Sequence, residues 1–230
     1  MLALLIVGFL ALAAGSPATT RAQNSPAATS SGALPAGVPQ TIDGIAARIE
    51  GDIITDSQVR ELAAFQQLVD GKPKPRDEII RELADQWVVR QEAAATRYQE
   101  PPQSDVDLAY SQLVKNFSSP GDFQSRLIAV GLSDATVRRL LREQLYLSRF
   151  LDYRFRPAAE VSEKQVQDYY DNELVPELKK RGDKIPPLDD VDDKIREVLI
   201  QRAIDQRSAQ WLDETRARLN IQVVPQEENP

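Results

Sequence analysis

The first strong pattern along the chain is a pair of short apolar runs around residue 50. Within residues 42–54, apolar positions flank the polar cluster Glu50-Gly51-Asp52. A compact polar turn between two extended runs is typical of a β-hairpin. An isolated hairpin is only marginally stable in water, so we expect another strand or a helix to cover it.

After the hairpin, the apolar spacing changes to that of helices. Thr55 with Gln58 forms a capping-box pattern, and the helical spacing that follows stops at Gly71. Ser162 with Gln165 repeats the same capping pattern further along the chain. Between these two points we expect helices that begin at Arg76, Ser104, Pro120 and Ser133.

The longest helical pattern covers residues 188–219, which contain neither glycine nor proline, and its apolar stripe changes face midway. One face is formed by Val191, Ile195, Val198 and Leu199, and the nearly opposite face by Ile204, Trp211, Leu212 and Leu219. Such a helix is expected to pack on two different surfaces. Residues 220–224 then alternate like a short strand that pairs with the hairpin. The pattern therefore predicts a mainly α multi-helix fold with a small β-sheet, formed by the N-terminal hairpin and a C-terminal strand.

The N-terminal residues show a targeting pattern. Residues 2–14 carry no polar side chain, a run that is shorter than a membrane span of ~20 residues and typical of a signal peptide. Small residues at Thr20 and Ala22 predict cleavage of residues 1–22; the alternative is an uncleaved anchor or a buried core helix. Residues 23–41 lack charge and are rich in alanine and serine, which predicts a flexible linker. Residues 225–230 are expected to form a disordered tail.

Composition removes several classes of function. The 230 residues include no cysteine and no histidine, which excludes disulfides, thiolate nucleophiles, imidazole metal ligands and serine–histidine triads. A net charge of −7 argues against general nucleic-acid binding. The chain also lacks a glycine-rich nucleotide loop. We therefore expect no enzyme activity, no cofactor and no metal.

Two groups of charged residues invite a binding role. Acidic residues begin the last helix at Asp189, Asp190, Asp192 and Asp193. They lack the loop of an EF-hand, so favourable interaction with the helix dipole explains them better than calcium binding. Basic residues gather at Arg126, Arg138, Arg139, Arg142, Arg149, Arg154 and Arg156. They suit either a docking surface for an anionic partner or, more commonly, a solvated helix face.

Five segments, taken in order, resemble a known family. They are IAARIEGDIITDSQV, IIRELADQWVVRQEAAATRY, DFQSRLIAVGLSDATVRRLLREQLYLSRFL, EVSEKQVQDYYDNE and VDDKIREVLIQRAIDQRSAQWLDETRARLNIQV. Their order is similar to that of the N-terminal chaperone domain, with its returning C-terminal helix, of SurA-type periplasmic chaperones. The resemblance covers most of residues 42–224 and implies one SurA N-terminal-like helical domain over that range.

The chain departs from that family in one respect. The family usually carries one or two parvulin-type prolyl isomerase domains before the last helix, whereas here residues 174–187 leave room only for a short linker. The resemblance implies an ATP-independent periplasmic chaperone, or holdase, that binds unfolded or extended exported proteins of the outer-membrane type without isomerase activity. It also suggests contact with the outer-membrane assembly machinery and no stable membrane span after processing. The alternative is a non-enzymatic scaffold that binds one folded envelope partner.

Aromatic residues are the candidates for contact with a client polypeptide. The chaperone interpretation predicts that a groove is lined by Phe65, Trp87, Phe117, Phe123, Phe150 and Trp211. Ordinary core packing is the alternative, and for any single residue of this set it is the commoner outcome, because a buried aromatic contributes several kcal/mol.

Overall fold

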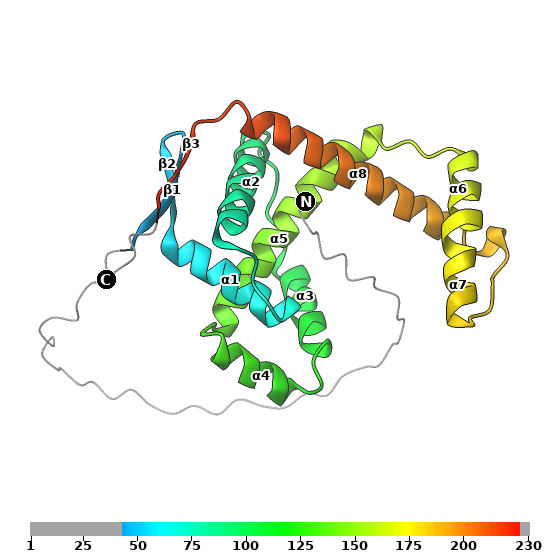
Figure 1. The fold of residues 1–230 in the computed structure, drawn as a ribbon, viewed down its shortest axis with the longest axis horizontal. Coiled ribbons are helices and arrows are strands. Elements are labelled where there is room, and N and C mark those ends of the chain that lie inside the picture. Colours follow the sequence, from blue (N-terminus) through cyan, green and yellow to red (C-terminus); the bar gives the residue numbers. More distant parts are fainter. Residues whose placement is uncertain (1–42, 226–230) are drawn as a thin grey trace, which may run out of the picture.

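A computed structural model describes residues 43–225. It is mainly helical with one small antiparallel sheet (Figure 1), so the predicted fold class is confirmed at that level. The predicted signal peptide and linker, and residues 226–230 of the predicted tail, lie outside the described residues. Within residues 43–225 no helix has the length and apolar character needed to cross a membrane.

The sheet joins the two ends of the described chain. It contains β1 (Ile45–Ile49), β2 (Asp52–Thr55) and β3 (Ile221–Val223), in the order β2-β1-β3 with both pairs antiparallel. Ala47 lies opposite both Ile54 and Val223, and it is fully buried. This arrangement confirms the predicted hairpin and the predicted pairing of the C-terminal strand.

The turn between β1 and β2 is held by the strand that returns. Glu50 has a left-handed backbone (φ 51°), which is uncommon for a residue with a side chain. Its N–H donates to the Asn220 carbonyl (3.1 Å), and the Asn220 N–H donates to Glu50 Oε1 (2.9 Å). The strained turn and the start of β3 therefore stabilise each other.

Five helices follow the hairpin: α1 (Asp56–Asp70), α2 (Arg76–Ala95), α3 (Gln103–Lys115), α4 (Pro120–Ala129) and α5 (Asp134–Phe155). The capping box of Thr55 with Gln58 is present, and Gly71 ends α1 with a left-handed backbone. The predicted N-cap at Ser104 is wrong. Pro102 has an extended backbone (φ −64°, ψ 153°) and precedes the helix directly, and its carbonyl accepts from the Asp105 N–H (3.1 Å). Ser104 consequently lies inside the first turn.

The remaining helices form an extension of the molecule. A 3₁₀ turn (Arg156–Ala158) ends α5, and α6 (Glu163–Tyr169) then continues through a π-helical turn (Tyr170–Leu174) into α7 (Val175–Arg181). The predicted short linker at residues 174–187 is therefore half helical. A second 3₁₀ turn (Leu188–Asp190) leads to α8 (Asp192–Arg216), which returns to the sheet.

Helix α8 packs on two surfaces, as its two-faced stripe predicts. Its C-terminal half lies against α2 and α5, where Ile204 and Leu212 are buried, and its N-terminal half contacts α6, near the buried Ile195. The face predicted from Val191, Ile195, Val198 and Leu199 is less buried than expected, because Val198 is 40% exposed. Figure 1 shows α6 and α7 at the far end of α8, away from the other helices.

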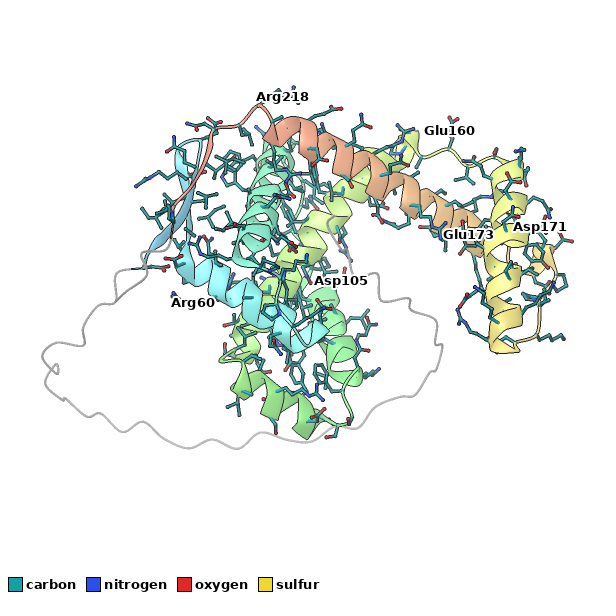
Figure 2. The ribbon with its side chains drawn as sticks, viewed as in Figure 1. Arg60, Asp105, Glu160, Asp171, Glu173 and Arg218 are labelled. Carbon is teal, nitrogen blue, oxygen red and sulfur yellow. The ribbon has the colours of Figure 1, made fainter. Side chains whose placement is uncertain are left out.

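The apolar core lies in one part of the molecule. Three clusters of buried side chains join the sheet, α1–α5 and the C-terminal end of α8. We call this part the body, and we call residues 159–191, with the N-terminal half of α8 on which they rest, the arm. Within the described chain, none of the three clusters includes a residue of the arm. In Figure 2, Glu173 lies on the side of the π-helical turn that faces α8, where it pairs with Arg202 of that helix.

Candidate functional site

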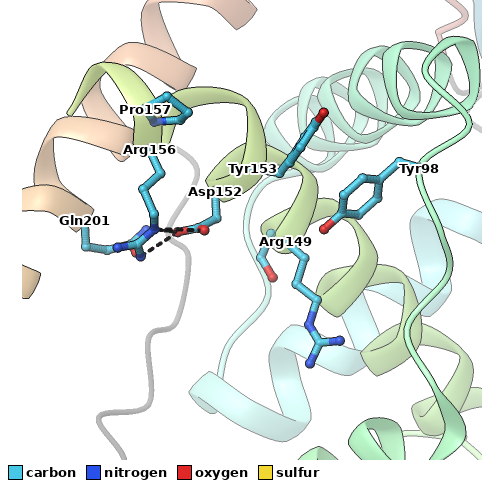
Figure 3. A pocket seen from close by; sticks show the side chains of 8 residues that line it. Tyr98, Arg149, Asp152, Tyr153, Arg156, Pro157 and Gln201 are labelled. Carbon is cyan, nitrogen blue, oxygen red and sulfur yellow. Dashed lines mark hydrogen bonds and ion pairs between the residues drawn. The ribbon is translucent and has the colours of Figure 1, made fainter.

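A groove opens at the junction of the body and the arm, where the end of α5 meets α8. We call it the corner groove; its volume is about 690 Å³. It is lined by Tyr98, Ser148, Arg149, Asp152, Tyr153, Arg156, Pro157 and Gln201 (Figure 3). These residues come from the loop after α2, the last turns of α5 with the turn that follows, and α8.

Aromatic rings form one wall of the groove. The ring centroids of Tyr98 and Tyr153 lie 5.4 Å apart, and Tyr98 contacts the buried Phe150 edge to face at 5.5 Å. Tyr153 is 62% exposed. The buried ring therefore supports Tyr98, which in turn supports an aromatic face that is open to solvent.

The position of Tyr98 depends on how α2 ends. The helix stops at Ala95, and Arg97 takes a left-handed backbone (φ 55°). The Tyr98 N–H then donates to the Ala93 carbonyl (2.9 Å) and closes the helix end. This reversal directs the chain back over α5, so a locally strained residue positions the groove wall.

The charged side chains of the groove are paired within the described chain. Arg156 donates to Asp152 (2.7 Å) and to both carboxylate oxygens of Glu197 (2.7 and 3.0 Å), which joins α5 to α8. The hydrogen bonds from Arg156 lower the pKa of Glu197 below its usual value. Arg149 likewise donates to Asp105 (2.6 Å) and lowers the pKa of that carboxyl. The groove thus presents aromatic faces with compensated charge, which suits an uncharged ligand segment.

Three of the six aromatic residues predicted to contact a client are in the core. Phe65, Phe123 and Phe150 are buried, so a client cannot reach them while the protein is folded. For these three residues the prediction of a groove lining is wrong, and the alternative of core packing is correct. The reason is general, because the fold buries its largest apolar side chains first.

The other three predicted aromatic residues are half-buried and lie apart from the groove. The Trp87 indole N–H donates to Asp52 (2.8 Å) and ties β2 to α2. Phe117 packs edge to face on a buried phenylalanine at 5.1 Å, at the end of α3. Trp211 stacks under the Arg154 guanidinium (4.8 Å from the ring centroid). The structure therefore does not bring the six predicted residues together, and the groove tyrosines are residues that the prediction missed.

The two groups of charged residues singled out in the sequence are the aspartates at residues 189–193 and the arginines at residues 126–156. Among residues 43–225, no group of three or more acidic, histidine or cysteine residues is arranged to hold a metal ion. Each arginine of the basic group except Arg142 pairs with an acidic side chain. The pairs are Arg126–Asp122, Arg138–Asp107, Arg139–Glu61, Arg149–Asp105, Arg154–Glu92 and Arg156–Asp152. These ion pairs favour the interpretation of a solvated helix face over that of a docking surface for an anionic partner.

One buried carboxylate lies outside the groove. Asp85 on α2 faces Arg216 at the end of α8, with 2.9 Å between Oδ1 and Nε but without the alignment of a hydrogen bond. Burial raises the pKa of Asp85 to about 6, and the positive charge of Arg216 opposes that rise only in part. This pair connects α2 to the returning helix inside the body.

No known family model matches this sequence, and a search of curated proteins finds no match. The groove, the arm and the surface charges therefore carry the functional argument.

Proposed function

We propose that the protein is an ATP-independent chaperone that binds unfolded exported polypeptides and does not isomerise prolyl bonds. The observation that supports this proposal is the corner groove, an open cavity with one exposed tyrosine ring, that of Tyr153, and compensated charges. Its volume lies within the range of ligand pockets, about 300–1,000 Å³, and is sufficient for a short polypeptide segment. The resemblance of the segment order to that of SurA-type chaperones supports the same proposal.

Binding in this groove is expected to be weak and reversible. The complex must offset the ordering entropy of a flexible client, so we expect micromolar dissociation constants. Because the rim charges already have partners, apolar burial provides most of the affinity. Binding should therefore change little with salt concentration.

We also propose that the protein is exported to the periplasm and has no prolyl isomerase activity. Residues 174–187, where the family carries its isomerase domain, form α7 and a loop in this chain. The apolar run at residues 2–14 supports periplasmic export with cleavage before Gln23. The intact mass of the protein from its own host tests the cleavage, and a membrane-bound form that keeps Met1 would contradict it.

The chaperone activity can be tested by light scattering. A denatured β-barrel protein is diluted into buffer with stoichiometric amounts of this protein, at low and at high salt. We expect the wild type to suppress aggregation at both salt concentrations, and Tyr153→Ala to lose most of that protection. Ile128→Ala is a matched control, because Ile128 is also an exposed large apolar residue (74%) but lies on α4 outside the groove.

The outcomes separate the two candidate functions. Unchanged aggregation at several-fold excess of the wild type would reject the chaperone proposal and leave a scaffold that binds one folded partner. Equal losses in both variants would show that exposed apolar area in general, and not the corner groove, binds the client.

A further inference from the structure

The far end of the arm carries a concentration of positive charge in an acidic protein. Residues 179–184, which we call the basic tip, form the last turn of α7 and the start of the following loop. Residues 174–187 contain four cations, Lys179, Lys180, Arg181 and Lys184, against two carboxylates, Glu177 and Asp183, in a chain of net charge −7. The tip lies at the end of the molecule opposite the sheet (Figure 1).

The charges of the tip are less compensated than those of the body. Lys180 and Arg181 share one carboxylate, Glu177, at 3.7 and 3.4 Å, and both remain largely exposed. For Lys179 and Lys184, no acidic partner lies within ion-pair distance among residues 43–225. By contrast, nearly every arginine on the α4–α5 surface has an acidic partner of its own. The tip is therefore a local excess of positive charge.

The end of α7 does not require these cations. Gly182 has a left-handed backbone (φ 74°), and its N–H donates to the Lys179 carbonyl (3.2 Å). The Asp183 N–H donates to the Leu178 carbonyl (3.0 Å). Backbone groups thus satisfy the last carbonyls of the helix, as in a Schellman motif. The basic side chains remain available for an external partner.

Partly exposed apolar groups accompany the charge. Helix α7 has no buried residue, and Ile185, which follows the tip directly, is 37% exposed. The tip projects from the end of the arm (Figure 1), so it can contact a flat surface. A projecting, basic and partly apolar segment is the combination that binds the interface of an anionic bilayer.

We propose that the basic tip docks the protein on a membrane surface rich in anionic lipid. This inference does not depend on the chaperone proposal. Each lysine or arginine near an anionic surface strengthens partitioning by about fivefold, so the tip supports weak binding that salt reverses.

Sedimentation with lipid vesicles tests the proposal. The protein is used from Gln23 onward, which keeps every described residue and removes the apolar run at residues 2–14 that would enter any bilayer by itself. Vesicles of phosphatidylglycerol and of phosphatidylcholine are compared at 20 and at 300 mM salt. We expect binding only to the anionic vesicles and only at low salt.

Two charge-matched variants locate the binding surface. Lys179→Gln/Lys180→Gln/Lys184→Gln should lower binding on the order of 100-fold, from the loss of three cations. Lys72→Gln/Lys115→Gln/Lys194→Gln removes the same charge from exposed positions outside the tip, and should retain most of the binding. Both variants should melt at the wild-type temperature, since all six side chains are exposed.

Three results would overturn the proposal. The first is no binding of the wild type to anionic vesicles at low salt. The second is an equal loss in both triple variants, which would indicate attraction without a defined surface. The third is binding to soluble polyglutamate but not to vesicles, which would assign the tip to an acidic polypeptide partner.

Discussion

In the body, every helix contributes buried apolar side chains to at least one of three clusters, whereas α6 and α7 contribute to none. Buried apolar contact in the arm centres on Val166 of α6 and Ile195 of α8. Charged pairs supply much of the remaining contact between α6, the π-helical turn and α8. Arg196 donates to Glu163 (2.8 Å), and Arg202 donates to both oxygens of Glu173 (2.8 Å each).

This difference shows which part of the molecule can move at low cost. Exposed ion pairs contribute about 0–1 kcal/mol each and are screened by salt, whereas buried apolar side chains contribute ~1.5–3 kcal/mol each. The arm should therefore open more readily than the body. The corner groove spans the junction, with Tyr98 and Tyr153 on the body and Gln201 on α8. Motion of the arm would change the width of the groove.

The strongest test removes the element that both parts share. Deletion of residues 188–225 takes away α8 and β3, and it uncovers the surfaces of α2, α5 and β1 on which they pack. We expect the loss of cooperative unfolding, measured by circular dichroism in a urea titration. An unchanged cooperative melt would show that the returning helix is peripheral.

A pair of apolar truncations measures the body against the arm. Phe150→Ala should lower the free energy of unfolding by ~3–5 kcal/mol, because it leaves a cavity in a packed core. Val166→Ala should cost only about 1.5 kcal/mol, from two lost methyl groups. Hydrogen exchange should accelerate throughout the molecule in the first variant and only in the arm in the second. Equal global losses would show that the two parts unfold as one unit.

The buried carboxylate gives the body a distinctive pH dependence. With a folded pKa of about 6 and an ordinary value of 3.8, Asp85 binds its proton more tightly in the folded state. Its contribution to stability therefore increases as the pH falls from about 7 to about 4, on the order of 2 kcal/mol. The charged groups that face it are Arg216, Asp213 and Glu82.

The measurement is the difference in unfolding free energy between the wild type and Asp85→Asn across that pH range. Subtraction removes the opposite trend of carboxyls with lowered pKa, such as Asp105 and Glu197, whose stabilising effect is lost as the pH falls. We expect the difference to shift in favour of the wild type at low pH. A difference that does not change with pH would contradict the assignment to Asp85.

The smallest expected effect concerns the ion pairs of the arm. Arg202→Gln should lower global stability by less than about 1 kcal/mol, yet accelerate hydrogen exchange in α6. Raising the salt concentration should accelerate exchange in α6 of the wild type more than in the variant. Arg207→Gln, an exposed position on the same helix, is the control and should leave α6 unchanged. Salt-independent exchange in the wild-type arm would argue against an ion-paired attachment.

Local features of the fold were predictable because they depend on neighbouring residues. The capping boxes at Thr55 and Ser162 form as expected, since each needs only residues within four positions. Ser104 is not the N-cap, because α3 already begins at Gln103, directly after Pro101 and Pro102. The pairing of β3 was predictable from alternation together with the requirement that the hairpin be covered.

The corner groove could not be predicted in the same way. Its residues come from three segments whose proximity depends on the crossing of α5 and α8. The prediction that six aromatic residues line one groove was wrong because a large apolar side chain has the same sequence signature in a core as in a groove. One local signal was present: Tyr153 lies off the apolar stripe of α5, which runs through Leu147, Leu151 and Phe155.

The contact between Glu50 and Asn220 joins positions that are 170 residues apart in sequence. A chain that emerges from its N-terminus therefore exposes β1 long before the partner strand becomes available. Contacts of this separation slow folding, because the loop must close before the pairing is gained. The body should accordingly stay incomplete during synthesis or translocation, and it should close only in a late step that involves the whole chain.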